Sequence, residues 1–295
     1  MSRSAAEAML VGTVTLWAFN FTVSKYILDK GFHPLAYSSV RYAAAALIFF
    51  AFTIAIEGTV RLARTDVVLA AFATFALLLN QLCFIYSLRF TTATTVALLF
   101  GTLPIFTALV ARGTGIERQA LRFWLAALLS FGGVALVAAG SGGKLSADLK
   151  GDALAVGATA TWAAYSVTIA PLMRRYSPFR LSAVFLLAVS VPLFALGASQ
   201  VEHQRWHFGA LVWIGFAFAV LGPLVLTNFL WFTAIDRVGP SHASLFANLQ
   251  PFLAAVIALI VLSESITSLQ VAGGLALAGG ILLAPRVSPP QPDAD

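Results

Sequence analysis

The feature that most constrains the fold of this chain is a succession of long apolar runs, separated only by short segments with charged or turn-forming residues. A helix crosses the hydrocarbon core of a bilayer with about 20 apolar residues. Ten runs of roughly that length can be drawn, at residues 7–28, 37–56, 67–88, 93–111, 121–140, 152–173, 180–200, 209–235, 241–262 and 269–284.

Composition supports this interpretation. Apolar side chains make up 60% of the residues and charged side chains 10%, whereas ordinary soluble domains have roughly 45–50% and about 25%. The connections are short, so backbone groups at membrane depth must be satisfied within helices. The runs are unbroken, unlike the alternating segments of a membrane barrel. The sequence predicts an all-α polytopic membrane protein with no soluble catalytic domain.

The net charge of +6 does not predict nucleic acid as a partner, because the basic residues are scattered between apolar runs. Cytoplasmic loops of membrane proteins are enriched in Lys and Arg. With both termini inside, the inner loops and tails hold eleven of the 18 Lys and Arg residues and the outer loops hold five. We therefore expect a multi-pass protein of the plasma (inner) membrane with both termini cytoplasmic. Cys83 is the one cysteine, and we expect no metal and no cofactor.

A repeat divides the chain into halves of nearly equal length. Thr91–Glu117 aligns without a gap with Val238–Glu264, at a shift of 147 residues. The halves 1–146 and 147–295 each contain five predicted spans, so the second half must enter the bilayer from the opposite side. We expect ten transmembrane helices as two inverted-topology repeats of five, in a basket-like bundle with a central cavity. Such repeats are typical of transporters with a site near the midplane.

Prolines occur inside four of the predicted helices, at positions 104, 192, 223 and 251. Each would remove a backbone hydrogen bond and bend its helix. Pro104 and Pro251 occupy equivalent places in the two halves. This symmetric pair of bends is either a pair of static kinks or a pair of hinges.

Several residues follow, in order along both halves, the pattern of a known family. In the first half they are Trp17, Asn20, Phe21, Lys25, Arg41, Ser87-Leu88-Arg89-Phe90, Ala93 and Pro104. In the second half they are Ala234-Ile235, Ser241, Ala243, Ser244, Leu245, Pro251, Glu264, Ile266-Thr267, Gln270, Gly273 and Gly280. On these residues the chain resembles the drug/metabolite transporter (DMT) superfamily with two EamA-type repeats. It is most similar to the aromatic-amino-acid exporter branch.

The resemblance covers almost the whole chain, and it is far more specific for the superfamily than for a substrate. It implies a ten-helix basket that opens alternately to each side and exports amino acids or other small metabolites. The chain departs from the common pattern at Leu262-Ser263-Glu264, where a Gly-Glu pair is usual. The change falls at a loop, and we infer no loss of activity from it.

Two predicted spans bring aromatic and polar side chains to the middle of the bilayer. A helix rises about 1.5 Å per residue, so Trp17 and Trp162, each about ten residues into its span, approach the midplane from opposite sides. Asn20 shares a helical face with Trp17, and Tyr165 shares one with Trp162. These stripes fit the wall of a substrate cavity, and helix packing with internally bonded polar groups is the alternative.

Other spans contribute further candidate substrate-binding residues, namely Gln81, Phe84, Phe100, Asn228 and His242. Amides in hydrocarbon need partners, so an interhelical hydrogen bond explains Gln81 and Asn228 as well as a substrate contact does. For Phe100 the alternative is packing. His242 is the only titratable residue expected near the cavity, and a helix-entry role is its alternative.

The remaining charged and indole side chains are expected near span ends. Lys25 and Arg41 should reach the outer interface, as long side chains do, with Lys25 paired to Asp29. A cationic outer vestibule for a substrate carboxylate is the alternative. Trp231 is assigned, with three other tryptophans, to the interfacial belts. No carboxylate is expected near the centre of a span.

These features favour a secondary transporter that exports small metabolites, foremost aromatic and other apolar amino acids, by alternating access. An aromatic pocket with a few amides suits a zwitterionic, partly apolar solute. Efflux of lipophilic drugs or organic cations is the alternative, and a passive channel is a further one. The sequence predicts no nucleophile–base pair and no cluster of metal ligands, so an enzyme is not expected. The expected partners are the small-molecule substrate and the lipid bilayer, and a monomer is compatible with this arrangement.

Overall fold

The computed structural model describes residues 3–140, 148–253, 256–257 and 267–284, and this part of the chain is predominantly helical. The first half contains α1 (Arg3–Asp29), α2 (Pro34–Glu57), α3 (Val67–Phe90), α4 (Ala93–Phe100), α5 (Leu103–Gly113) and α6 (Leu121–Gly140). The second half contains α7 (Leu149–Met173), α8 (Pro178–Glu202), α9 (Ala210–Val220), α10 (Thr227–Val238), α11 (Pro240–Ala247) and α13 (Ser268–Leu283). A 3-10 turn, η1 (Arg64–Asp66), precedes α3, and a π-helical segment, η2 (Leu221–Leu226), joins α9 to α10.

Eight helical segments in the described residues are long and apolar enough to cross a membrane. In order along the chain they coincide with the first eight predicted spans, and their ends differ from the predicted ones by at most four residues. The tenth predicted span corresponds to α13, a shorter apolar helix of 16 residues. The ninth, at 241–262, begins as α11 and lies partly outside the described residues. The chain is an all-α, multi-pass membrane protein.

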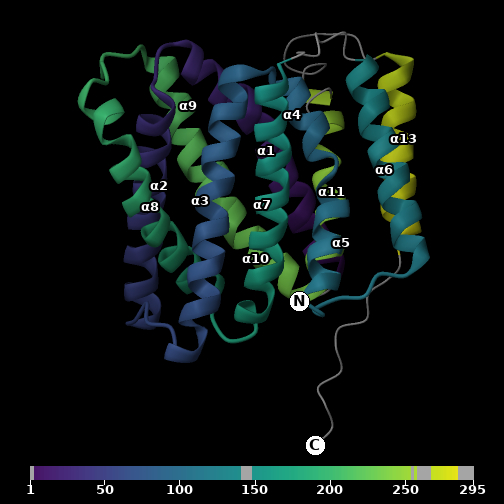
Figure 1. Cartoon of the computed structure of the whole chain (residues 1–295), viewed down its shortest axis with the longest axis horizontal. Coiled ribbons are helices and arrows are strands. Elements are labelled where there is room, and N and C mark those ends of the chain that lie inside the picture. Colours follow the sequence, from purple (N-terminus) through teal and green to yellow (C-terminus); the bar gives the residue numbers. More distant parts are fainter. Residues whose placement is uncertain (1–2, 141–147, 254–255, 258–266, 285–295) are drawn as a thin grey trace, which may run out of the picture.

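Two pairs of corresponding helices, one helix from each half, lie antiparallel against each other. α2 packs along α8 at one edge of the bundle, and α6 packs along α13 at the other (Figure 1). The backbone N–H of His33, before α2, donates to Gln204, just past the end of α8, at 2.7 Å. Thr267, before α13, donates its hydroxyl to the carbonyl of Gly140, the last residue of α6, at 3.1 Å. In the middle of the bundle α3 packs along α7, and α1 along α10.

The bundle has two ends, which we name after a residue at each. At the Asp66 end, at the bottom of Figure 1, the α2–α3 connection meets the α7–α8 connection, where Arg175 lies 2.5 Å from Asp66. The Phe32 end lies opposite, where the α1–α2 connection meets the α8–α9 connection. α1 runs from the Asp66 end to the Phe32 end and α7 runs the other way. The first helices of the two halves therefore cross the bundle in opposite directions.

Both halves interrupt one predicted span at the same point. Gly101 and Thr102 separate α4 from α5, and, 147 positions later, Asn248 and Leu249 form a turn after α11. In both turns the two backbone N–H groups donate to carbonyls three residues back. Pro104 follows the first turn and lies in the first helical turn of α5, where no helix hydrogen bond is lost. The prediction that Pro104 bends the interior of a helix was wrong, because α4 ends before it and a new helix, α5, begins at Leu103.

The α6–α13 pair depends on glycines that let the two backbones approach. A Cβ atom built on Gly133 would lie 2.8 Å from the carbonyl oxygen of Gly273 and 2.9 Å from Cγ of Leu277. A backbone oxygen cannot move aside without separating the helices. Small residues at such positions are typical of helix contacts in membranes, where close packing supplies much of the stability.

We predict that Gly133→Ala destabilises the protein by about 1–3 kcal/mol, because the added methyl group overpacks this contact. The measurement is thermal unfolding of the purified protein in detergent. Gly132→Ala is the matched control, since a Cβ at Gly132 meets nothing within 4 Å. Alanine is also the better helix former, so the control should be neutral or stabilising. Equal stability of the two variants would contradict the close approach.

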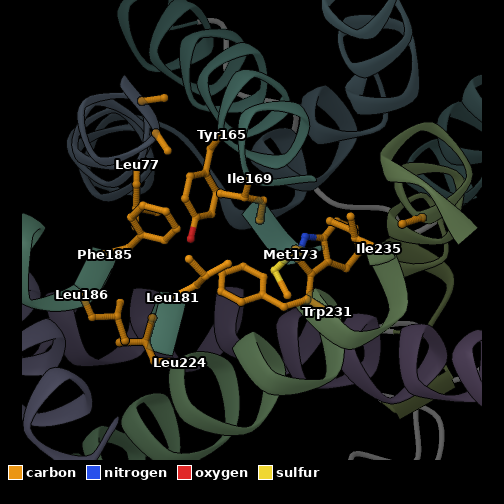
Figure 2. Close-up of a cluster of buried hydrophobic side chains, with 14 of the residues drawn as sticks. Leu77, Tyr165, Ile169, Met173, Leu181, Phe185, Leu186, Leu224, Trp231 and Ile235 are labelled. Carbon is orange, nitrogen blue, oxygen red and sulfur yellow. The ribbon is translucent and has the colours of Figure 1, made fainter. Parts of the chain in front are cut away.

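The largest buried apolar cluster draws on both halves of the chain. Figure 2 shows its centre, where Tyr165 and Ile169 of α7 lie near Phe185 and Leu181 of α8, with Trp231 of α10 beside them. Because α7, α8 and α10 all meet here, the cluster holds the helices that border the central pocket.

Candidate functional site

A central pocket of about 90 Å³ lies between the two halves of the bundle. That volume has room for more than one water-sized molecule. The pocket is lined by side chains from α1, α2, α3, α7, α8 and α10, from the interrupted spans and from η2. These residues are Trp17, Asn20, Phe21, Arg41, Tyr42, Leu77, Asn80, Gln81, Phe84, Phe100, Leu103, Trp162, Leu186, Pro223, Leu224, Thr227, Asn228, Trp231 and Gln250.

Three tryptophans form one wall of this pocket. The ring of Trp17 lies 5.2 Å from that of Trp162, at 88° to it, and 4.9 Å from that of Trp231. The Trp17 indole N–H donates to the hydroxyl of Thr227 at 3.1 Å. Each ring comes from a different helix, and edge-to-face contacts of this kind add stability beyond simple burial.

The assignment of Trp231 to an interfacial belt was wrong. Its side chain is 1% exposed and lies in the middle of the bundle. The predicted span ended at residue 235, whereas α10 continues to Val238. Trp231 therefore lies about two turns from the helix end, too deep for the membrane interface.

Three phenylalanines form a second aromatic group in the pocket. The ring of Phe21 lies 5.6 Å from that of Phe84 and 5.7 Å from that of Phe100. They come from α1, α3 and α4, and Gly101 follows Phe100 directly at the break. The break thus helps to place Phe100 against the pocket.

Arg41 is the one charged side chain among the described residues that line the pocket. It is 2% exposed, so the prediction that it reaches the outer interface was wrong. α2 begins at Pro34, which places Arg41 seven residues into the helix, about 10 Å from its start. The expectation that His242 is the only titratable residue near the cavity was wrong for the same reason.

A network of hydrogen bonds surrounds this guanidinium group. Arg41 donates from Nη2 to Oε1 of Gln81 at 3.0 Å and from Nη1 to the Tyr37 hydroxyl at 3.4 Å. Gln81 in turn donates to Ser38 at 3.1 Å. The Ser24 hydroxyl lies 2.9 Å from that of Tyr37 and donates to Oδ1 of Asn20 at 3.2 Å. The network joins α1, α2 and α3 beside the pocket.

Other pocket amides also have protein partners. Asn80 donates to the carbonyl of Ala158 on α7 at 2.8 Å, which links α3 to the second half. Asn228 donates to the carbonyl of Leu224 at 2.6 Å, and Gln250 to that of Ala247 at 3.0 Å. Both acceptors are carbonyls near irregular turns, where the regular helix hydrogen bonds are interrupted. Leu224 lies in η2, and Ala247 is the last residue of α11, directly before the break.

Seven of the nine predicted site residues line the pocket, namely Trp17, Asn20, Gln81, Phe84, Phe100, Trp162 and Asn228. Tyr165 lies behind Trp162, where its ring packs 5.8 Å from that of Phe185 and is covered by α8. His242 lies in the first turn of α11, and its Nε2 is 3.3 Å from Nη2 of Arg3 on α1. Helical spacing predicts that Tyr165 and Trp162 share a face of α7. It cannot predict that another helix, α8, covers Tyr165.

Two pairs of charged residues connect the loops of the Asp66 end. Asp66 is 4% exposed, and it accepts hydrogen bonds from Arg175 at 2.5 Å and from the Tyr176 hydroxyl at 2.7 Å. Glu57 lies 2.6 Å from Arg180. The α2–α3 connection is thus tied to the start of α8 and to the loop before it.

Neutral groups connect the corresponding loops at the Phe32 end. The Phe32 ring stacks on that of Phe208 at 4.9 Å and meets the edge of Trp206 at 5.6 Å. Gln200 accepts from the backbone N–H of Leu35 at 2.8 Å. Lys25 lies 3.4 Å from Asp29, which confirms the predicted pair. The contacts between the two halves therefore differ at the two ends: they are formed by neutral groups at the Phe32 end and by charged groups at the Asp66 end.

Away from the pocket, Glu117 lies in the α5–α6 connection, outside the spans. Burial raises the pKa of its carboxyl group, and hydrogen bonds from Ser241 and Gln119 act in the opposite direction. No group of three or more His, Cys, Asp or Glu in the described residues could hold a metal ion.

Comparison with known proteins gives relatives along the whole chain. It is 27% identical to the "Uncharacterized transporter YyaM" of Bacillus subtilis over 290 residues, 95% of this chain and 93% of that protein. It is 33% identical to the "Threonine/homoserine exporter RhtA" of Salmonella typhimurium over 124 residues, which cover 42% of this chain and 41% of the exporter. A crystal structure of another protein, 17% identical, superposes with a TM-score of 0.78 over 96% of each chain and shows the same fold.

A family model matches both halves of the chain. Residues 4–139 and 149–285 each match the EamA-like transporter family, one match for each half of the chain. The two named relatives are described as a transporter and an exporter, in agreement with this match, and proteins of this family are membrane transporters and not enzymes. The chain therefore belongs to the EamA-like transporter family.

Proposed function

We propose that this transporter exports a small metabolite, foremost an amino acid with an aromatic or other apolar side chain, by alternating access at the central pocket. The observation that carries the proposal is the composition of that pocket. Trp17, Trp162 and Trp231 provide apolar surface, while Asn20 and Gln81 provide polar groups that can orient a solute. Concave sites with mostly apolar walls and a few polar groups suit small amphipathic ligands.

The partial likeness to a threonine/homoserine exporter supports an amino acid as the class of solute. Threonine and homoserine are smaller and more polar than the solutes proposed here, and the aromatic walls of the pocket favour the larger apolar ones. Efflux of organic cations is disfavoured by the Arg41 charge in the pocket.

We further propose that the chain crosses the membrane ten times, as two inverted repeats within 1–146 and 147–295. The antiparallel packing of α2 with α8 and of α6 with α13 supports this arrangement. The matched interruptions after Phe100 and after Ala247 support it too. The excess of Lys and Arg in the predicted inner loops supports cytoplasmic termini in the plasma (inner) membrane. The Asp66 end then faces the cytoplasm.

The test is a counterflow assay with purified protein in liposomes. Liposomes loaded with an unlabelled solute are diluted into a trace of the labelled one, and the panel contains amino acids, organic cations and sugars. We expect amino acids with apolar side chains to be exchanged, with saturable rates. Exchange of cations or sugars alone would contradict the proposed substrate, and flux without saturation or counterflow would indicate a passive channel.

We predict that Trp162→Ala lowers this exchange about tenfold to a hundredfold. Loss of one buried aromatic contact costs about 1.5–3 kcal/mol of solute binding. Because Trp162 is only partly buried, insertion and expression should stay near normal. Trp213→Ala is the control, since Trp213 is 37% exposed and lies outside the pocket. Loss of folded Trp162→Ala protein would favour a packing role instead.

A further inference from the structure

The guanidinium group of Arg41 is a buried cation without a countercharge in the described residues. No carboxylate in that part of the chain forms an ion pair with it. Its two hydrogen-bond acceptors, Gln81 and Tyr37, are both neutral. The Nε atom is buried and has no hydrogen-bond partner among the residues that the structure describes.

Such a group is costly to keep in a membrane protein. Arginine does not lose its proton in proteins, and it has five N–H donors. The protein uses two of them, which leaves three, one of them on Nε. The rings of Tyr37 and Tyr42, with centroids 4.9 and 5.6 Å from Cζ, stabilise the charge only in part. Ionisable residues at membrane depth commonly mark a substrate or ion pathway.

Among the described residues that line the pocket, no acid could pair with this cation. Its polar lining consists of amides and hydroxyl groups, from Asn20, Tyr42, Asn80, Gln81, Thr227, Asn228 and Gln250. A carboxylate on the solute would satisfy both the charge and the unused donors, because the planar guanidinium fork matches its two oxygens.

We propose that Arg41 anchors the carboxylate of the transported solute, so that the pocket selects molecules with one carboxylate and an apolar body and rejects molecules with only a positive charge. This inference rests on the proposed function and adds a charge rule to it. Gln81 positions the guanidinium group through Oε1. The apolar body of the solute packs against the rings of Trp17, Trp162 and Trp231. An ammonium group, where present, meets amide oxygens and ring faces.

The experiment compares four probes that share one phenyl body. They are phenylalanine, 3-phenylpropionate, phenylalaninamide and phenethylamine, and the last two lack a carboxylate. Binding to the purified full chain at neutral pH is read from the fluorescence of the pocket tryptophans, and transport is read from competition in the counterflow assay. Wild-type protein should bind the two carboxylates at least about 30-fold more tightly than the amide or the amine, the loss expected when one partner of a buried charge pair is missing.

The variants test whether Arg41 causes this preference. In Arg41→Gln the ratio of phenylalanine affinity to phenylalaninamide affinity should fall towards one. Arg41→Lys should keep part of it, because it retains the charge but loses the two-pronged geometry. Arg89→Gln is the matched control, since Arg89 is an exposed arginine at the end of α3. The ratio compares two probes on the same preparation, so partial loss of folded protein does not alter it.

The outcomes separate the two proposals. If phenylalaninamide or phenethylamine binds as tightly as phenylalanine, or if Arg41→Gln keeps the wild-type ratio, the anchor is overturned while transport stands. If Arg41→Gln yields no folded protein, the affinity ratios of the wild type and of Arg41→Lys test the anchor. A wild-type ratio near one, or an Arg41→Lys ratio equal to that of the wild type, would overturn it. If wild-type protein neither binds nor exchanges any amino acid or carboxylate, the proposed function fails and the anchor fails with it.

Discussion

Replacing Glu57 by Gln together with Asp66 by Asn is expected to open the Asp66 end of the transporter. In the structure Asp66 contacts Arg175 and Tyr176, and Glu57 contacts Arg180, so both carboxylates join loops of the two halves. These contacts must separate whenever a solute passes this end. Hydrogen bonds to charged groups contribute about 1.5–3 kcal/mol each. Losing both links should shift the ratio of open to closed protein by about a hundredfold.

The measurement uses a single reactive cysteine behind these contacts. Cys83 is the one native cysteine, so Cys83→Ser gives a cysteine-free background. Leu172, 1% exposed and one residue before the end of α7, is then replaced by Cys. Its labelling by a water-soluble maleimide should be slow in the parent and much faster in the double variant. Asp236→Asn removes an exposed carboxylate at the end of α10 and should not change the rate. Equal rates in all three proteins would show that the ion pairs do not hold this end closed.

Trp231→Ala is expected to have the largest effect on stability. The side chain is almost fully buried between the rings of Trp17 and Trp162 and the apolar core. Truncating a buried aromatic residue to alanine costs about 3–5 kcal/mol, because the neighbours collapse only partly into the cavity. A loss of this size should lower the melting temperature by roughly 10 °C or more.

Thermal unfolding in detergent tests this, with two comparisons. Trp231→Phe should recover most of the stability. It keeps an aromatic ring, and the Trp231 indole N–H has no hydrogen-bond partner in the described part of the chain that could be lost. Trp162→Ala removes a tryptophan from the same wall but from a less buried position, so it should unfold closer to wild type. A Trp231→Ala protein that melts like wild type would mean that the ring is a pocket lining without a structural role.

The spans could be predicted from the sequence because the bilayer imposes a length on them. A run of about 20 apolar residues is a strong signal, and the first eight predicted spans coincide with the apolar segments described here. Helical spacing also placed Trp17 and Asn20 correctly on one face, since residues three apart on a helix point the same way. Such local rules hold whatever the neighbouring helices do.

Arg41 and Trp231 were misplaced because their depth was measured from predicted helix ends. Each helix extends three residues beyond the predicted end nearest to them, at Pro34 and at Val238. Three residues correspond to almost one turn of helix. That difference moves a side chain from the membrane interface towards the middle of the bundle, so an arginine and a tryptophan of the pocket were both missed.

The interruption at Gly101 and Thr102 was also beyond the sequence pattern. The apolar run continues on both sides of the interruption, and Pro104, the residue expected to bend this span, lies after the turn. A Cβ at Gly101 would lie 2.9 Å from Cγ1 of Val134 on α6. The same Cβ would lie 2.8 Å from the carbonyl oxygen of Leu98 in the preceding turn, so glycine avoids both a local clash and a clash with α6, and no local spacing reveals the second.

The π-helical segment between α9 and α10 has a consequence for how this pocket could evolve. A π turn contains one residue more than an α turn. Thr227, Asn228 and Trp231 face the pocket just after η2. The wider turn absorbs that additional residue, so deleting one residue of Leu221–Leu226 would restore a continuous α-helix and leave α10 facing the pocket much as before. The same deletion within α10 would instead rotate the residues that follow it by about 100° and turn different side chains towards the solute, so η2 is the place where this span can change length at little cost to selectivity.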